Sequence, residues 1–427
     1  MSKQINGFSK LSKDEKIDWL ANQFFSDKAQ GIHILKSYWN TNPDLQKLHD
    51  DFIENTISNF YFPYAVAPNF VINGKTYTVP MAIEESSVVA AASLVAKFWS
   101  TRGGFKTKVI STTKIGQVHF MFSGKEEDLQ AYFNSVKQEL FEVTNNITKN
   151  MRKRGGGILN IELRNKTKDL KDYYQLHVTF ETKDSMGANF INTCLEAIAS
   201  YFNEKTELEL QIVMSILSNY VPDCLVRAEV SCKVAELYKN NAEVYAQKFV
   251  NALNIANAEP HRAVTHNKGI MNGIDSVVIA TGNDFRAVES GVHAYASKTG
   301  KYKSLSNAKI EGDMFHFWME IPLALGTVGG LTKLHPLAKL SLDILEHPTA
   351  QQLMEIVAVV GLAQNFAALR ALTTTGIQSG HMKMHLGNII KQLTTDEKEV
   401  AYLLDHFKNR PVSHSEVTEV FKSMKDK

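Results

Sequence analysis

The segment from Lys268 to Asp284 constrains the fold more than any other part of this chain. Its two charged ends are sixteen positions apart, and three glycines fall between them: Gly269, Gly273 and Gly282. A continuous helix would hold the two side chains roughly 24 Å apart. If they act together, the chain must bend at a glycine, which permits turns that a Cβ forbids. The alternative interpretation is a surface ion pair that flanks a core helix.

The asparagines beside this pair suggest a chemical role as well. Lys268 follows Asn267, and Asp284 follows Asn283. A Lys–Asp pair enclosed by amides could polarise a carbonyl group and hold the oxyanion that develops on it. Composition alone does not choose between this role and the surface ion pair.

Bulk properties predict a soluble protein of two or three domains, because a chain of 427 residues is too long to fold around one small hydrophobic core. The net charge of +2 gives no reason to expect nucleic acid or an anionic membrane as partner. The three cysteines form no CxxC pair, which favours a reducing compartment without disulfides or structural zinc. The N-terminus has no apolar signal core, and the longest apolar run, Val88–Ala96, is too short to span a membrane. We therefore expect a cytoplasmic location.

Local patterns predict an α+β chain. A strand is expected at 75–80, and an alanine-rich helix begins at Val88. Ser86 or Ser87 can cap that helix, and the preceding carboxylates of Glu84 and Glu85 suit its positive end. The alanines would allow neighbouring backbone to pack closely, which is typical of a central buried helix.

A compact α+β insert is expected between residues 106 and 220. Apolar and polar residues alternate over 159–163 and 176–180, as in half-buried strands. An amphipathic helix follows through about Phe202, and a final helical region begins after Gly376.

Two motifs in the insert could bind phosphate. Residues 184–187, Asp-Ser-Met-Gly, lie at a strand-to-helix junction, where free amides and the helix dipole favour an anion. Residues 152–157 combine three cations with three glycines, which also suits a nucleotide phosphate. A helix cap and a solvated turn are the ordinary alternatives. The GxGxxG fingerprint is absent, so the pattern does not favour a Rossmann fold.

Two further groups could move protons. A glutamate at 84 or 85 in a partly apolar cleft beside a second acid would have a raised pKa, which suits a proton donor. His381 and His385 have the i, i+4 spacing of metal ligands, but no third ligand lies nearby, so we assign no metal. His381 follows Gly380 and suits a mobile proton donor at a helix start, with an ordinary exposed histidine as the alternative.

Together these motifs resemble the bacterial class II branch of the 3-hydroxy-3-methylglutaryl-CoA (HMG-CoA) reductase family, over nearly the whole chain. The strongest matching segments are 84–93, 184–189, 265–269, 282–284, 361–365 and 380–382.

The resemblance implies a catalytic set and a reaction. The catalytic positions are Glu85, Lys268, Asp284 and His381, and those contacting the acyl group are Ser87, Arg262, Asn219, Asn272 and Gln364. The HMG-CoA thioester would be reduced twice by hydride from a nicotinamide cofactor, giving mevalonate and CoA. By this resemblance Lys268 stabilises the oxyanion, Asp284 orients it, Glu85 protonates the aldehyde and His381 protonates the CoA thiolate.

The resemblance also implies an architecture. A large domain around a central buried helix would comprise 1–110 and 223–375, with a small ferredoxin-like dinucleotide-binding domain inserted at 111–222. Residues 376–427 would form a C-terminal helical flap that closes over the substrate. The active site would lie at the interface of a homodimer, which could assemble further.

Cofactor preference depends on the insert. We expect the dinucleotide to contact six residues: Asp184, Met186, Gly187, Asn189, Arg152 and Arg154. Cations without an acid from 148 to 154 favour the 2′-phosphate of NADPH, with NADH as the alternative.

Three departures from the family pattern are Ser86, Ser185 and the segment 54–58. They stand where the family usually has proline, alanine and Glu-Asn-Val-Ile-Gly, and the last leaves details of CoA binding open. Two other functions also stay open. One is a catabolic enzyme that oxidises mevalonate with NAD, and the other is a non-catalytic CoA- or nucleotide-binding protein.

Overall fold

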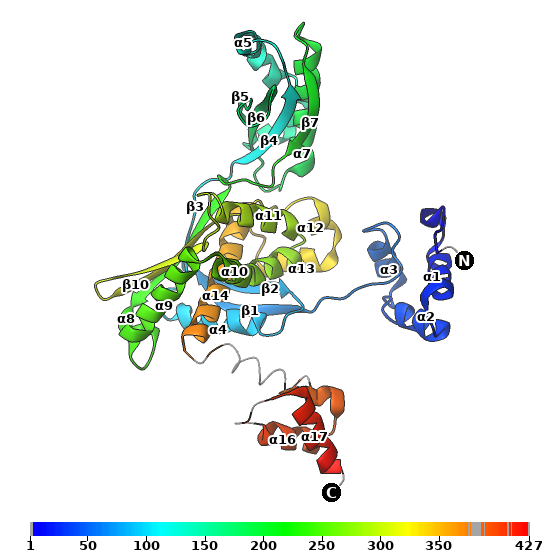
Figure 1. Ribbon diagram of the computed structural model, residues 1–427, viewed down its shortest axis with the longest axis vertical. Helices are drawn as coiled ribbons and strands as arrows, with labels where there is room; N and C mark the ends of the chain where they lie inside the picture. The colour runs from blue at the N-terminus through cyan, green and yellow to red at the C-terminus, as the bar shows by residue number, and fades with distance from the viewer. Residues whose placement is uncertain are drawn as a thin grey trace. The chain divides into compact units, whose positions relative to one another are not determined.

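Helices and antiparallel sheets share the chain in the computed structural model, which describes residues 3–374, 376, 386–387, 389–407, 410 and 412–425 (Figure 1). The chain divides into two compact units, Met1–Pro63 and Tyr64–Lys427. The first unit contains four short helices: η1 (Phe8–Lys10), α1 (Lys13–Phe24), α2 (Lys28–Ser37) and α3 (Pro43–Asp50). Ser12 starts α1 with a capping box, in which Ser12 and Glu15 each bond the other's backbone N–H.

The predicted α+β insert is present as a βαββαβ unit. Its antiparallel sheet has the order β5-β6-β4-β7, with strands β4 (Lys114–Met121), β5 (Gly157–Asn165), β6 (Tyr173–Glu181) and β7 (Gln211–Leu217). Helices α5 (Glu126–Glu142), α6 (Asn145–Lys153) and α7 (Ala188–Glu204) complete the unit. Alternate strand residues such as Val118, Phe120, Leu176 and Val178 form a separate core with α5 and α7. This order is the ferredoxin-like arrangement that was predicted.

The larger part of the second unit contains the other two sheets. Strands β1 (Tyr64–Ile72) and β2 (Lys75–Ala82) form a hairpin, and a four-stranded sheet has the order β3-β8-β10-β9. The strands of the latter are β3 (Lys106–Val109), β8 (Leu225–Lys233), β10 (Met314–Pro322) and β9 (Ser306–Glu311). The helices are α4 (Val88–Ser100), α8 (Val234–Leu237), α9 (Ala242–Ala258), α10 (Pro260–Ala280), α11 (Phe285–Ala296), α12 (Gly330–Leu334), α13 (Pro336–Ile344) and α14 (Ala350–Thr373).

The central buried helix is α14, so our assignment of this role to the alanine-rich α4 was wrong. Leu94 on α4 is 61% exposed, whereas fifteen residues of α14 are buried. Helix α14 packs against α10, α4, α9 and β8, and so occupies the middle of the core (Figure 1). By length and composition alone, α14 is apolar enough to cross a membrane, which the length of the longest apolar run did not indicate. Its burial is that of a core helix.

The glycines of α10 do not bend it, contrary to one form of our expectation. The helix is continuous from Pro260 to Ala280 and ends just before Gly282, whose φ of 69° is left-handed. Gly273 serves close packing instead, since a Cβ there would lie 2.7 Å from the Val360 carbonyl oxygen on α14.

A third hydrophobic core belongs to the C-terminal helices α16 (Glu397–His406) and α17 (His414–Lys425). It includes Leu386, Ile390, Leu403, Phe407 and Val417. A helical C-terminal region was predicted, and the described part is helical. The boundaries 1–110, 111–222, 223–375 and 376–427 remain predictions.

Candidate active site

A cleft of about 510 Å³ brings together six of the predicted residues: Glu85, Ser87, Arg262, Lys268, Asn272 and Gln364. They come from the turn before α4, from α10 and from α14. Sequence distance between these elements is large, so the packing of α4 and α14 on α10 creates the site.

An ion pair lies at the mouth of the cleft. The Lys268 ammonium is 2.6 Å from Oε2 of Glu85, and the Asn272 amide donates to the same oxygen at 3.2 Å. Asn272 is one turn after Lys268, so both side chains leave the same face of α10. The Lys268 side chain is 60% exposed, and this cation can therefore be reached by a ligand.

The turn before α4 holds Glu85 in an unexpected way. Ser87 is the N-cap residue, but its φ of 75° is left-handed and its side chain does not cap the helix. The predicted serine cap is therefore wrong. With no cap to form, the turn directs the Glu85 carboxylate to α10 rather than to the amides of α4.

The inner wall of the cleft is polar and buried. Nε2 of His266 lies 2.8 Å from Ser306 Oγ, and that hydroxyl donates to Asn365 Oδ1 at 2.7 Å. The serine oxygen must then accept from His266, which assigns the proton to Nε2. Burial, with the charge of Arg262, lowers the pKa of His266 to about 3, so its ring is neutral. The network ties α10 to β9 and α14.

Two wall groups are suited to bind a polar ligand. Gln364 is 8% exposed, and its Oε1 has no hydrogen-bond partner among the residues that the structure describes. Arg262 is half-buried one turn before His266, and burial lowers the pKa of its guanidinium. A carboxylate ligand would balance the charge of the half-buried Arg262 guanidinium, which is partly removed from water.

Asp284 does not join this cleft. Its Oδ1 accepts from the backbone N–H of Arg286 and Ala287 at 3.0 and 3.2 Å and so caps α11. Within the described residues, no hydrogen bond or ion pair links it to Lys268. The expected Lys268–Asp284 contact is thus not formed within one chain, because α10 runs on for about 18 Å beyond Lys268.

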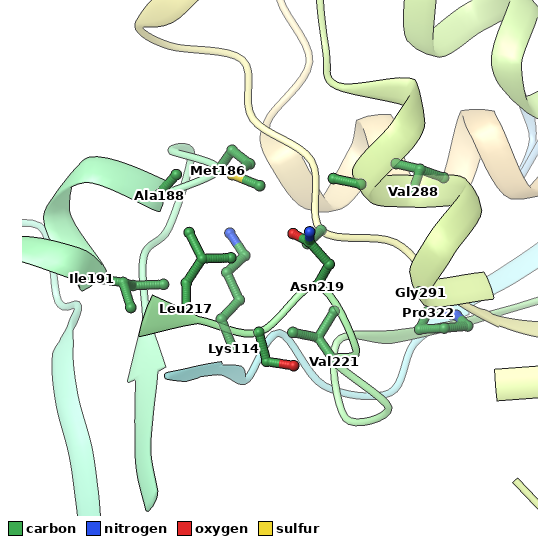
Figure 2. Close-up of a pocket in the computed structure, with 13 residues that line it drawn as sticks. Lys114, Met186, Ala188, Ile191, Leu217, Asn219, Val221, Val288, Gly291 and Pro322 are labelled. Carbon is green, nitrogen blue, oxygen red and sulfur yellow. The ribbon is translucent and has the colours of Figure 1, made fainter. Parts of the chain in front are cut away.

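Asp284 lies instead near the predicted cofactor turn. Oδ1 of Asn283 accepts from Gly326 N at 2.8 Å, and a Cβ on Gly326 would be only 2.5 Å from Met186 N. Asn219, which was expected at the acyl group, lines a second cavity together with Met186 and the α11 residue Val288 (Figure 2). One chain therefore carries two groups of site residues.

The cofactor turn, residues 182–187, links β6 to α7. Gly187 is the N-cap of α7 with φ 91°, and no side chain caps this helix. Asp184 is committed to structure, because its Oδ1 accepts from Ala350 N at 2.8 Å and its carbonyl from Thr327 N at 2.8 Å. The free N–H groups of α7 remain available for an anion.

The basic segment lies beside this turn, as the cofactor prediction needs. Gly157 pairs with Glu181 across β5 and β6, and a Cβ on Gly155 would be 3.4 Å from Cε of Lys183. Arg152 and Arg154 at the end of α6 are exposed. Arg152 donates to Asn145, and Arg154 contacts the Met151 sulfur.

Sequence reasoning missed two buried charged groups. Lys114 is 5% exposed at the start of β4, on the same strand face as Val118 and Phe120, so strand alternation could have indicated its burial. Burial raises the pKa of Asp275 to about 8, with a hydrogen bond and like charge from Glu289. No sequence signal distinguishes that pair. His381 and His385 lie outside the described residues.

The chain is similar to one enzyme family along most of its length. Residues 13–386 match the family described as hydroxymethylglutaryl-coenzyme A reductase. The chain is 40% identical over 398 residues to the 3-hydroxy-3-methylglutaryl-coenzyme A reductase of Archaeoglobus fulgidus, covering 91% of this chain and 87% of that protein. It is 35% identical over 353 residues to a probable enzyme of the same name from Borreliella burgdorferi, covering 81% and 80%.

A solved structure is similar as well. The class II 3-hydroxy-3-methylglutaryl-CoA reductase of Streptococcus pneumoniae bound to NADPH in open conformations has a TM-score of 0.73 and 37% identity to this chain. The match covers 86% of this chain and 99% of that one.

Proposed function

The chain belongs to the hydroxymethylglutaryl-coenzyme A reductase family, and from this premise we propose that the cleft at Glu85 and Lys268 is its catalytic site. The family reaction reduces the HMG-CoA thioester twice with hydride from a nicotinamide cofactor and releases CoA and mevalonate. The observation that carries the assignment is the 2.6 Å contact between Lys268 and Glu85 in a cleft lined by polar groups.

Lys268 is the electrophilic group in this proposal. When hydride reaches the thioester carbon, negative charge develops on the carbonyl oxygen, and an ammonium within hydrogen-bond distance stabilises that charge. The Glu85 carboxylate, which also accepts from the Asn272 amide, orients the cation. Only the oxygen of the transition state carries the full charge, so the interaction lowers the barrier more than it tightens substrate binding.

Glu85 is the proton donor of the second reduction. After CoA leaves, the aldehyde accepts hydride at carbon, and its oxygen takes a proton from Glu85, which must enter this step protonated and leaves it as the carboxylate that pairs with Lys268. The departing CoA thiolate also requires a proton, which we assign to His381. Both are general-acid steps that need a donor within reach of the reacting atom.

The remaining cleft residues bind the acyl group. Arg262 supplies a half-buried cation for the substrate carboxylate, and the unpaired Oε1 of Gln364 can accept from the substrate hydroxyl. Ser87 lines the same cleft. Polar atoms that are unpaired in the buried wall gain partners when the substrate enters, which favours a hydroxylated acid over an apolar acyl group.

The nicotinamide cofactor lies at the turn 182–187 in this proposal, with NADPH preferred. The exposed cations of Arg152 and Arg154 suit its 2′-phosphate, and the pneumococcal relative is bound to NADPH. Met186, Gly187 and Asn189 present backbone and side chains around the start of α7. Asp184 acts on the cofactor indirectly in this proposal, because its side chain accepts from Ala350 N and so keeps the turn in place.

A homodimer would complete the site, because one chain separates Asp284 from Lys268. We propose that Asp284 of the partner subunit enters the cleft, along with Asn219 and the cofactor turn. An exposed apolar patch supports a contact there: Phe285, Leu331, Leu334, Leu337 and Leu340 are each at least 41% exposed. Gly282 packs against Leu331 and Ala338, which places the patch beside Asp284. Higher assembly is compatible with this arrangement.

We further propose a cytoplasmic enzyme that works in the biosynthetic direction. The purified protein would be mixed with HMG-CoA and either NADPH or NADH, while nicotinamide absorbance and free thiol are followed. Two dinucleotides oxidised for each thiol released is the expected result, with the lower KM for NADPH. A lack of oxidation with both dinucleotides would refute the proposal and favour a non-catalytic binding protein. A preference for mevalonate and NAD would favour the catabolic direction.

A further inference from the structure

Lys114 is a buried cation that contacts no anionic side chain among the described residues. Its side chain is 5% exposed at the first residue of β4. Nζ donates to Thr182 Oγ1 at 2.5 Å and to the Ser185 carbonyl oxygen at 2.7 Å. Neither acceptor is charged, and the ammonium has three N–H groups to donate. A buried charge normally has a counter-charge, so this site calls for an explanation.

The two nearest carboxylates are committed elsewhere. Glu181 accepts from the Thr112 hydroxyl and from the Lys183 backbone N–H. Asp184 accepts from Ala350 N at the start of α14. Burial lowers the pKa of Lys114, and the more distant charges of Glu181 and Asp184 only partly oppose this effect. Within the part of the chain that the structure describes, no carboxylate therefore contacts the Lys114 charge directly.

Lys114 lies at the wall of the second cavity. Figure 2 shows its amine directed into the space near Met186, Ala188 and Asn219. The cavity measures about 20 Å³, which admits one water-sized group such as a ligand oxygen. The uncapped N-terminus of α7 starts here, so its dipole adds positive potential at the same place.

We propose that Lys114 binds an anionic oxygen of the nicotinamide dinucleotide, and that the pyrophosphate supplies this oxygen. The inference rests on the proposed function, which places the cofactor at the turn 182–187. The acyl carboxylate has its own cation in the other cleft, Arg262. The 2′-phosphate has the exposed arginines of α6. Of the anionic groups of substrate and cofactor, the pyrophosphate is the one without an assigned cation, so we assign it to Lys114. The pyrophosphate is present in both NADPH and NADH.

The test uses Lys114→Met, which keeps the length of the side chain and removes its charge. We expect KM and the dissociation constant to rise by the same factor for NADPH and NADH, about 10-fold or more for a lost charged hydrogen bond. Nicotinamide fluorescence measures binding without turnover. Thermal unfolding should be unchanged or shifted upward, because removing a buried unpaired charge relieves its desolvation. Lys108→Met, on an exposed strand position, is the matched control and should change none of these values.

Each other outcome overturns the proposal. A rise confined to NADPH would assign Lys114 to the 2′-phosphate, and a rise confined to HMG-CoA would assign it to the acyl carboxylate. If dinucleotide binding is unchanged and the unfolding temperature falls, the role of Lys114 is only to stabilise the turn 182–187. The fluorescence arm separates this result from a failure of the proposed function, since it reports dinucleotide binding even if wild-type protein oxidises none.

Discussion

The charge on Lys268 decides whether the first cleft can act on a thioester. Replacing Lys268 with alanine should lower turnover of HMG-CoA at least about 100-fold, because the ammonium that would stabilise the oxyanion is lost. Among the described residues, Lys268 is the only cation that contacts Glu85. Folding should be little affected, since exposed ion pairs contribute little to stability. Steady-state turnover and thermal unfolding measure the two effects. Lys248→Ala, at an exposed position of α9, is the control, and turnover near the wild-type value in Lys268→Ala would refute the role.

Asp275 makes stability depend on pH. Burial, a hydrogen bond and the like charge of Glu289 raise its pKa from 3.8 to about 8. The folded protein therefore keeps a proton that the unfolded chain releases, and the contribution to stability is lost as pH rises from about 4 to about 8. Asp275→Asn should show a smaller loss of denaturant midpoint between pH 5 and pH 8 than wild type. Equal losses in both proteins would show that this carboxyl does not hold the proton.

Single residues were predictable where motif and packing agree. Glu85, Arg262 and Asn272 were predicted as site residues, and they line the same cleft as Lys268. Lys114 was missed, because a lysine at a strand start is ordinarily at the surface, whereas the turn 182–187 packs against this one.

At the scale of elements, α10 and α14 pack closely through their glycines. A Cβ on Gly273 would meet the Val360 carbonyl oxygen at 2.7 Å, and one on Gly361 would meet Ile274 Cγ1 at 2.7 Å. Gly273→Ala should therefore lower the free energy of unfolding by about 1–2 kcal/mol, the overpacking cost less the helix-propensity gain. Gly269→Ala is the matched control, with nothing within 4 Å of the added methyl. It should raise stability by about 0.5–1 kcal/mol. Chemical denaturation measures both, and equal shifts would contradict close packing at Gly273.

The two kinds of glycine also show why element geometry was only partly predictable. A glycine in a sequence can bend a helix, end it or admit a neighbour, and the choice depends on what packs there. Gly282 ends α10 with a left-handed φ, whereas Gly273 admits α14. The strands at 75–80 and 176–180 were predictable because both segments are rich in β-branched and aromatic residues, although neither strand alternates strictly between buried and exposed positions. The identity of the central helix depended on contacts from several elements, and composition favoured α4 over α14.

At the scale of the whole molecule, each chain carries two partial sites. The cleft at Lys268 has four of the five residues proposed to contact the acyl group, and the region at Asp284 has the proposed cofactor turn. The resemblance predicted these residues and a site at a homodimer interface, but it did not state which of the residues each chain supplies. In a two-fold symmetric dimer, the Lys268 cleft of each chain can meet the Asp284 region of its partner.

Mixing two inactive variants tests this arrangement most directly. Lys268→Ala and Asp284→Ala proteins would be denatured together in equal amounts, refolded and assayed for HMG-CoA-dependent oxidation of the dinucleotide. If the site is shared between chains, half of the dimers are mixed and each has one intact site, so about a quarter of wild-type activity should return. Each variant refolded alone is the control and should stay inactive. No recovery in the mixture, although mixed dimers form, would show that Lys268 and Asp284 act within one chain and would contradict the account.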